Sequence, residues 1–144
     1  MFTVNVEGAV IKDDKWLICR RSNKEEHAGG KLSLVGGTVE LEGFTRDILE
    51  RTVKREIMEE TGVEITEEVY YVHNTSFVTD DNVHVINIVF LCIWEKGVGK
   101  VKDLDELSEI YWMTTDEILK NDKAPDYLKD GINRAAKIKE RVYI

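Results

Sequence analysis

Three glutamates in the segment REIMEETGV, residues 55–63, have a spacing that would gather them on one side of a helix. Glu56, Glu59 and Glu60 stand at positions i, i+3 and i+4, so in an α-helix they fall within an arc of roughly 100°. Three like charges this close repel one another unless a cation neutralises them. Oxygen ligands on a rigid element suit Mg²⁺ or Mn²⁺, with other coordination positions left to water and substrate phosphate. The spacing therefore predicts a divalent metal site.

The alternative is that this acidic run is solvated surface, which is the commoner role of such runs. Its neighbours favour a packed helix instead. Ile57 and Val53 lie four positions apart and give the helix a buried side. Gly62 can adopt the left-handed conformation that ends a helix, after which Val63 and Ile65 would begin a strand. We therefore expect the glutamates to lie on a helix with a fixed end.

The segment from Arg55 to Val63 resembles the signature of the Nudix hydrolase superfamily, G-x5-E-x7-R-E-U-x-E-E-x-G-U, where U is a bulky aliphatic residue. The second half of the signature matches at every specified position. Gly36-Gly37 is similar to its glycine-rich start, but the separation from Gly37 to Arg55 is four residues longer than in the signature. The first glutamate of the signature then corresponds to one of three acidic residues, and the choice stays open. These candidates are Glu40, Glu42 and Asp47.

The resemblance implies hydrolysis of a nucleoside diphosphate linked to another group X, through attack of water on a phosphorus of the diphosphate bridge. It implies Mg²⁺ or Mn²⁺ as cofactor, with Glu56, Glu59 and Glu60 as metal ligands. Arg55 would orient a glutamate through a charge-assisted hydrogen bond. The general base has two candidates, Glu106 on a loop and Glu56 on the helix. A catalytically weak nucleotide-binding or sensor module is the alternative, in case the extra residues displace the helix.

Two further pairs of residues are candidates for substrate binding. Gly36 and Gly37 have no Cβ, so their backbone could approach a metal ion or a phosphate closely, although a plain strand-ending turn is the alternative. Arg20 and Arg21 follow a predicted strand and could hold a terminal phosphate, because guanidinium groups suit bidentate contacts to its oxygens. Surface arginines at a strand end are the alternative for this pair.

Aromatic and histidine side chains leave the recognition of the nucleotide open. Phe77, Trp112 and Tyr127 could stack on a base, but aromatic residues on strands and amphipathic helices are more often core. None of the histidines His27, His73 and His84 has the spacing of a metal ligand, although His73 or His84 could line a pocket.

Composition and charge restrict the class of partner. The chain has 144 residues, of which 42% are hydrophobic, and a formal net charge of −8. This charge argues against binding of polymeric nucleic acid, which requires a basic surface. A small nucleotide or nucleotide derivative remains the expected substrate, and a homodimer is possible. No stretch has the length and apolar character of a membrane span. Cys19 and Cys92 lie in apolar runs, so we expect packed thiols and a cytoplasmic location.

The elements that must position these residues follow from hydrophobic patterns. Runs at 3–12 and 16–20, separated by Asp13-Asp14, predict a hairpin. Runs at 69–78 and 83–94, separated by turn residues, predict a second antiparallel pair. A turn is expected at Gly36-Gly37.

Helices are expected at three places, and they determine the fold class. The long helix should begin near Thr45 and end near Thr61; a short one at 114–120 should be capped by Thr115 or Asp116; and an amphipathic one should follow Pro125. A further strand is expected at 110–113. This order suits an α/β/α sandwich, and the resemblance implies the Nudix fold with a mixed, mostly antiparallel sheet. We expect residues 1–144 to form a single Nudix hydrolase domain.

Overall fold

The computed structural model describes residues 1–22 and 30–142, which form eight strands and three helices. The strands are β1 (Phe2–Lys12), β2 (Lys15–Arg21), β3 (Leu32–Ser33), β4 (Val35–Thr38), β5 (Glu64–Ile65), β6 (Tyr70–Val78), β7 (His84–Lys96) and β8 (Leu107–Thr114). The helices are α1 (Ile48–Thr61), α2 (Thr115–Leu119) and α3 (Asp126–Arg141). His27 lies outside the described residues.

The strands form one mixed sheet around the central pair of β1 and β7. These two strands are parallel, with pairing that runs from Phe2 opposite His84 to Ile11 opposite Ile93. The other pairings are antiparallel: β5 and β6 pair with β7, β2 and β4 pair with β1, and β3 and β8 pair with β2. The two predicted antiparallel pairs and the mostly antiparallel character of the sheet are confirmed.

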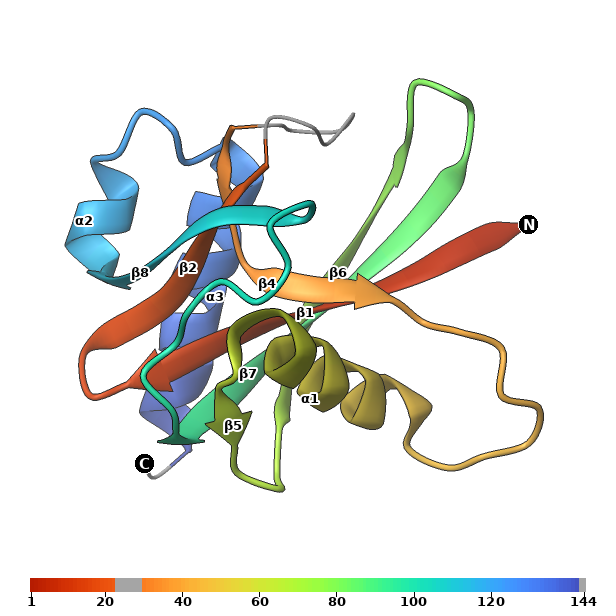
Figure 1. Cartoon of the computed structure of the whole chain (residues 1–144), viewed down its shortest axis with the longest axis horizontal. Coiled ribbons are helices and arrows are strands. Elements are labelled where there is room, and N and C mark those ends of the chain that lie inside the picture. Colours follow the sequence, from red (N-terminus) through yellow and green to blue (C-terminus); the bar gives the residue numbers. More distant parts are fainter. Residues whose placement is uncertain (23–29, 143–144) are drawn as a thin grey trace.

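Helices α1 and α3 cover opposite faces of the sheet (Figure 1). Alternation along β1 divides its apolar residues between the two layers. Val6 packs in the same buried cluster as Ile57 of α1, whereas Ala9 packs with Leu128 and Ile132 of α3. The predicted α/β/α sandwich is confirmed.

The turn expected at Gly36-Gly37 is wrong, because both glycines lie inside β4. They pair with β1, Gly36 opposite Glu7 and Gly37 opposite Val6. A Cβ on Gly36 would lie only 1.9 Å from the carbonyl oxygen of Val6. The glycines therefore allow β4 to pack closely on its neighbours instead of reversing the chain.

Helix α1 begins at Ile48, three residues after the expected Thr45. Asp47 precedes it in a left-handed conformation, with φ of 58°, so the helix cannot extend backwards through this residue. At the other end the prediction is confirmed: Gly62 has φ of 73°, and its N–H donates to the carbonyl of Met58. The glutamates are thus held in the last two turns of a helix with a defined end.

The short helix α2 is capped by Thr114 and not by Thr115 or Asp116 as expected. The Thr114 hydroxyl accepts from the N–H of Glu117 at 3.2 Å, and the Glu117 carboxylate accepts from the N–H of Thr114 at 2.9 Å. This reciprocal pair satisfies two amide groups at the start of the helix. The Thr115 hydroxyl instead accepts from the indole of Trp16 at 2.9 Å.

Cys19 and Cys92 are buried and free, as expected for packed thiols. Burial raises the pKa of the Cys19 thiol to about 12. None of the helices within residues 1–22 and 30–142 combines the length and apolar character that crossing a membrane requires.

Candidate functional site

A cleft of about 500 Å³ lies beside α1, β4 and the first half of β1. Its described lining carries many more acidic than basic side chains, with Arg21 as the basic one. The acidic side chains are Glu7, Glu40, Glu56, Glu59, Glu60, Asp103 and Glu106. Such a cleft attracts cations and repels an anionic substrate that arrives without them.

The three helix glutamates all line this cleft, at different depths. Glu60 is the deepest, with 7% of its surface exposed, whereas the side chains of Glu56 and Glu59 are 17% and 57% exposed. Burial raises the pKa of Glu60 to about 8, and the negative charges of Glu56 and Glu106 contribute to the shift, whereas the positive charge of Arg21 opposes it. Burial also raises the pKa of Glu56, although Arg55 opposes the shift. Full ionisation of the cluster is therefore unfavourable unless a cation is bound.

Glu60 provides the test of whether a divalent ion suits this cleft. Its Oε2 atom is buried and has no hydrogen-bond partner among the described residues, which is costly for a carboxylate. No three His, Cys, Asp or Glu side chains in residues 1–22 and 30–142 are close enough to hold an ion as they stand. The donor set is nevertheless the oxygen-only type that Mg²⁺ and Mn²⁺ prefer, so the residues fit such an ion once the side chains converge.

Arg55 lies among the glutamates and links α1 to the chain that follows β4. Its guanidinium nitrogens lie 3.7 Å from Glu56, 3.9 Å from Glu59 and 4.0 Å from Glu40. These separations exceed hydrogen-bond length, so the attraction is between charges. Arg55 is placed to bias the positions of several carboxylates at once.

Gly37 makes room for Glu56. A Cβ on Gly37 would lie 2.4 Å from the carboxyl carbon of Glu56, and therefore any larger residue would displace that carboxylate. The two neighbouring glycines thus have different tasks, because Gly36 faces the backbone of β1 and Gly37 faces the acidic cluster.

The loop between β7 and β8 brings Asp103 and Glu106 to the cleft. Backbone bonds fix it to the end of α1: the N–H of Lys102 donates to the carbonyl of Glu60, and the N–H of Lys100 donates to that of Thr61, both at 3.0 Å. Glu106 is one of the two candidates for the general base, and Asp103 is an additional lining residue. A loop carboxylate is hard to recognise in sequence, since only the fold brings it to the helix.

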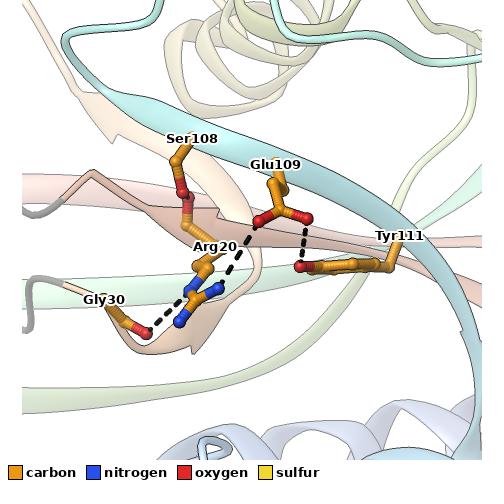
Figure 2. A network of polar contacts seen from close by, with 5 residues as sticks. All are labelled: Arg20, Gly30, Ser108, Glu109 and Tyr111. Carbon is orange, nitrogen blue, oxygen red and sulfur yellow. Dashed lines mark hydrogen bonds and ion pairs between the residues drawn. The ribbon is translucent and has the colours of Figure 1, made fainter.

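Arg20 and Arg21 are separated by the geometry of β2. Arg21 lines the cleft, and Arg20 is not among the lining residues. The Arg20 guanidinium instead donates to the Gly30 carbonyl at 3.3 Å and pairs with Glu109 at 3.4 Å, and Glu109 also accepts from Tyr111 at 2.6 Å (Figure 2). The Ser108 hydroxyl donates to the Arg20 carbonyl at 3.4 Å. Arg20 is thus engaged in a surface network between strands.

The three candidates for the first glutamate of the signature occupy different places. Glu40 lines the cleft and faces Arg55. Glu42 pairs with Arg51 at 3.0 Å, and Asp47 precedes the helix in its left-handed conformation. Glu40 is therefore the one of the three that shares the cleft with the helix glutamates.

Two lining residues from β1, Asn5 and Glu7, were missed in the sequence. A signal existed, since polar residues occupy alternate positions in the first half of the strand, at Thr3, Asn5 and Glu7. Its meaning depends on the pairing of β1 with β7, which places Asn5 opposite Asn87.

Comparison with known proteins agrees with this geometry. The NUDIX domain family matches residues 1–131. The fold is similar to a MutT NUDIX hydrolase from Burkholderia pseudomallei, with a TM-score of 0.78 and 21% identity over 93% of this chain and 98% of that one. A MutT protein from Methanosarcina mazei Go1 has a TM-score of 0.78 and 25% identity, with 96% of both chains covered.

A third similar structure is the NUDIX domain of Shewanella oneidensis NrtR complexed with ADP ribose. It has a TM-score of 0.71 and 16% identity over 98% of this chain and 88% of that one. No curated protein matches the sequence.

The family match extends over most of the chain and includes the cleft, α1 and the start of α3. Hydrolases of this family generally use divalent metal ions such as Mg²⁺ or Mn²⁺. The chain belongs to the Nudix family of hydrolases, which act on pyrophosphate bonds.

Proposed function

We propose that this protein hydrolyses small compounds that contain a nucleoside diphosphate, with Mg²⁺ or Mn²⁺ held by Glu56, Glu59 and Glu60. The observation that carries the proposal is the buried Oε2 atom of Glu60, which has no hydrogen-bond partner in the described part of the chain and lies in an acidic cleft. A buried carboxylate oxygen without a partner destabilises the fold. A bound cation would remove this cost, which favours a metal ion at this place. When bound, the ion neutralises phosphate charge and orients the diphosphate.

The remaining groups of the cleft position the substrate and the attacking water. Arg55 is a positioning residue, because its charge lies within about 4 Å of Glu56, Glu59 and Glu40. Arg21 is the candidate for a terminal phosphate, since it is the basic side chain in the described lining. Arg20 is left out of this role, because Glu109 and Gly30 engage its guanidinium.

The base that takes a proton from the water is Glu106 or Glu56. Both line the cleft, and both contribute to the raised pKa of Glu60. Burial raises the pKa of Glu56 above its ordinary value, which makes its carboxylate a stronger base. Glu106→Gln and Glu56→Gln distinguish the two candidates. The base is the residue whose substitution removes the acidic limb from the pH profile of kcat.

The substrate class rests on the family and on the charge of the cleft. One structurally similar NUDIX domain binds ADP ribose, a nucleoside diphosphate linked to a further group. An acidic cleft and a net charge of −8 suit a small substrate that arrives with metal ions, not a polymeric nucleic acid. The proposal includes one domain over residues 1–144 in the cytoplasm, with a homodimer as a possible assembly.

The test is a panel of nucleoside triphosphates, nucleotide sugars, ADP-ribose and dinucleoside polyphosphates, assayed with Mg²⁺ and with Mn²⁺. We expect metal-dependent release of phosphate or a nucleoside monophosphate from at least one compound. Glu60→Gln should lower kcat by about 100-fold or more, because ligand loss commonly costs one to two orders of magnitude or beyond. Glu67→Gln is the matched control, since Glu67 is exposed and outside the cleft lining. Equal activity in both variants would contradict the proposal.

A nucleotide-binding or sensor module is the second candidate. The four extra residues before Arg55 favour it, because they alter the approach to α1. Metal-dependent nucleotide binding with no product after prolonged incubation would establish the sensor and exclude the hydrolase.

A further inference from the structure

The loop between β7 and β8, residues 97–106, contains no helix or strand, so its position depends on individual contacts. Its second half carries Asp103 and Glu106, which line the acidic cleft. Its first half lies against the end of α1 (Figure 1). A Cβ on Gly97 would come within 2.8 Å of the carbonyl oxygen of Gly62, the residue that ends the helix. The contacts of the first half therefore influence where the two carboxylates lie.

Two tryptophan side chains hold the start of this loop. The indole N–H of Trp94, on β7, donates to the carbonyl of Gly97 at 2.7 Å. The indole N–H of Trp112, on β8, donates to the carbonyl of Val98 at 2.9 Å. Both distances are ordinary hydrogen-bond lengths. Two consecutive carbonyls of the loop are thus bonded to side chains of the two strands that it connects.

The two indole rings are themselves restrained. The Lys12 ammonium, at the end of β1, lies 4.3 Å from the ring centroid of Trp94 and 5.7 Å from that of Trp112, within the range of cation–π attraction. Both rings also pack against the buried cluster that includes Ile57 of α1. The indole N–H groups are therefore donors in fixed positions.

The stretch that follows is bonded to the end of α1. The N–H of Lys100 donates to the carbonyl of Thr61, and the N–H of Lys102 donates to that of Glu60. Together with the bond to Val98, these contacts attach every second residue of the loop from 98 to 102. Displacement of the start of the loop would therefore disturb the bonds beside Glu60.

The chain then turns into the cleft. The carbonyl of Asp103 accepts from the N–H of Glu106 at 3.2 Å and from that of Leu107 at 3.0 Å. Leu107 has only 2% of its surface exposed and belongs to the buried cluster beneath α1. This turn is thus fixed at one end by the core and at the other by the contacts of residues 97–102. Loss of the earlier contacts would release one of its two ends.

We propose that Trp94 and Trp112 are positioning residues for hydrolysis. Their indole N–H groups hold the loop so that the carboxylates of Asp103 and Glu106 face the glutamates of α1. The inference rests on the proposed function, because it assumes that the water and the diphosphate meet in the acidic cleft. Loss of the donors should lower kcat and leave KM nearly unchanged, since a misplaced group raises the reaction barrier without removing a contact to the substrate.

The kinetic experiment uses Trp94→Phe and Trp112→Phe, which keep an aromatic ring beside Lys12 and lack the indole N–H. The substrate is a compound that the wild-type protein hydrolyses with Mg²⁺. We expect each variant to lower kcat by about fivefold and the double variant by about tenfold or more, with KM within about twofold of the wild-type value.

Trp16→Phe is the matched control. Trp16 donates its indole N–H to the Thr115 hydroxyl at 2.9 Å and is buried in the cluster on the α3 side of the sheet. The control therefore loses the same kind of bond away from the cleft, and its kcat should equal that of the wild-type protein. Thermal unfolding of each protein identifies a general loss of stability, and the single variants supply the test if the double variant does not fold.

Amide hydrogen exchange reports on the loop without turnover. The N–H groups of Lys100 and Lys102 should exchange at least about fivefold faster in Trp94→Phe and Trp112→Phe than in the wild-type protein and in Trp16→Phe. The amides that pair β1 with β7 should exchange at the same rate in all four proteins, which separates local release of the loop from global unfolding.

The outcomes distinguish this inference from the proposed function. If the wild-type protein hydrolyses a compound and both variants keep its kcat, or if Trp16→Phe loses as much, the positioning role is overturned and the proposed function stands. If no compound is hydrolysed, the proposed function fails. Faster exchange at Lys100 and Lys102 then still supports the attachment of the loop by the indoles, and unchanged exchange overturns it.

Discussion

The buried carboxyl group of Glu60 links folding to pH. Its pKa is about 8 in the folded chain against an ordinary value of 4.5, chiefly because of burial. Between these values the folded protein holds a proton that the unfolded chain releases. Unfolding therefore becomes easier as pH rises across this window, and the stabilising effect of the retained proton is complete only below about pH 4.5.

We therefore predict that the unfolding free energy of the metal-free protein falls between about pH 5 and pH 8. Glu60→Gln should reduce this decline, because the amide has no proton to lose. Glu7 and Glu56 also have raised pKa values, so part of the decline should remain. Urea denaturation in the presence of a chelator measures the effect. A stability that rises over this range in the wild-type protein would show that Glu60 is ionised in the folded state.

At the level of single residues, the sequence predicts contacts along one element better than contacts between elements. The helix spacing predicted that Glu56, Glu59 and Glu60 share a volume, and all three line the cleft. It could not show which of Arg20 and Arg21 faces the cleft, because that depends on how β2 pairs with its neighbours. The pairing of β2 with β8 shifts register between these two residues, and local sequence pattern does not reveal such a shift.

At the level of elements, the two adjacent glycines of β4 allow this strand to lie close to both β1 and α1. Gly36 allows contact with the backbone of β1, and Gly37 leaves space for the Glu56 carboxylate. The sequence predicted a turn here, because two glycines together usually mark a chain reversal. The close packing of β4 between β1 and α1 overrides that tendency.

This division predicts different outcomes for two alanine substitutions. Gly36→Ala places Cβ 1.9 Å from the Val6 carbonyl and should destabilise the fold by about 3 kcal/mol or more, since backbone cannot move aside cheaply. Gly37→Ala meets only a side chain and should keep the fold while lowering kcat, because Glu56 is displaced. Chemical denaturation and steady-state kinetics measure the two effects. Equal loss of stability in both variants would contradict this assignment.

Helix α1 shows where local signals suffice and where they do not. Its end was predicted, because Gly62 is a strong termination signal and the preceding pattern is periodic. Its start was placed three residues early, at Thr45, whose hydroxyl donates to Glu42 instead of capping the helix. The extra residues relative to the family signature lie in this stretch, where several polar residues compete to cap the helix.

At the level of the whole molecule, the sheet gathers residues that are far apart in sequence. The parallel pairing of β1 with β7 brings Asn5 and Asn87 together, and the backbone bonds of the loop 100–107 hold Glu106 near α1. The fold class and the helix glutamates could be predicted from local pattern. The contributions of β1, β7 and the loop could not, because they arise from long-range pairing.

The most direct test measures the binding of Mn²⁺ to the protein without nucleotide. Binding is monitored in electron paramagnetic resonance through the loss of the signal of the free ion. The wild-type protein and Glu67→Gln should bind Mn²⁺ with the same affinity. Glu60→Gln should bind it at least about tenfold more weakly, because it lacks a charged oxygen ligand. Equal affinity in all three proteins would contradict a metal site built on the carboxylates of α1.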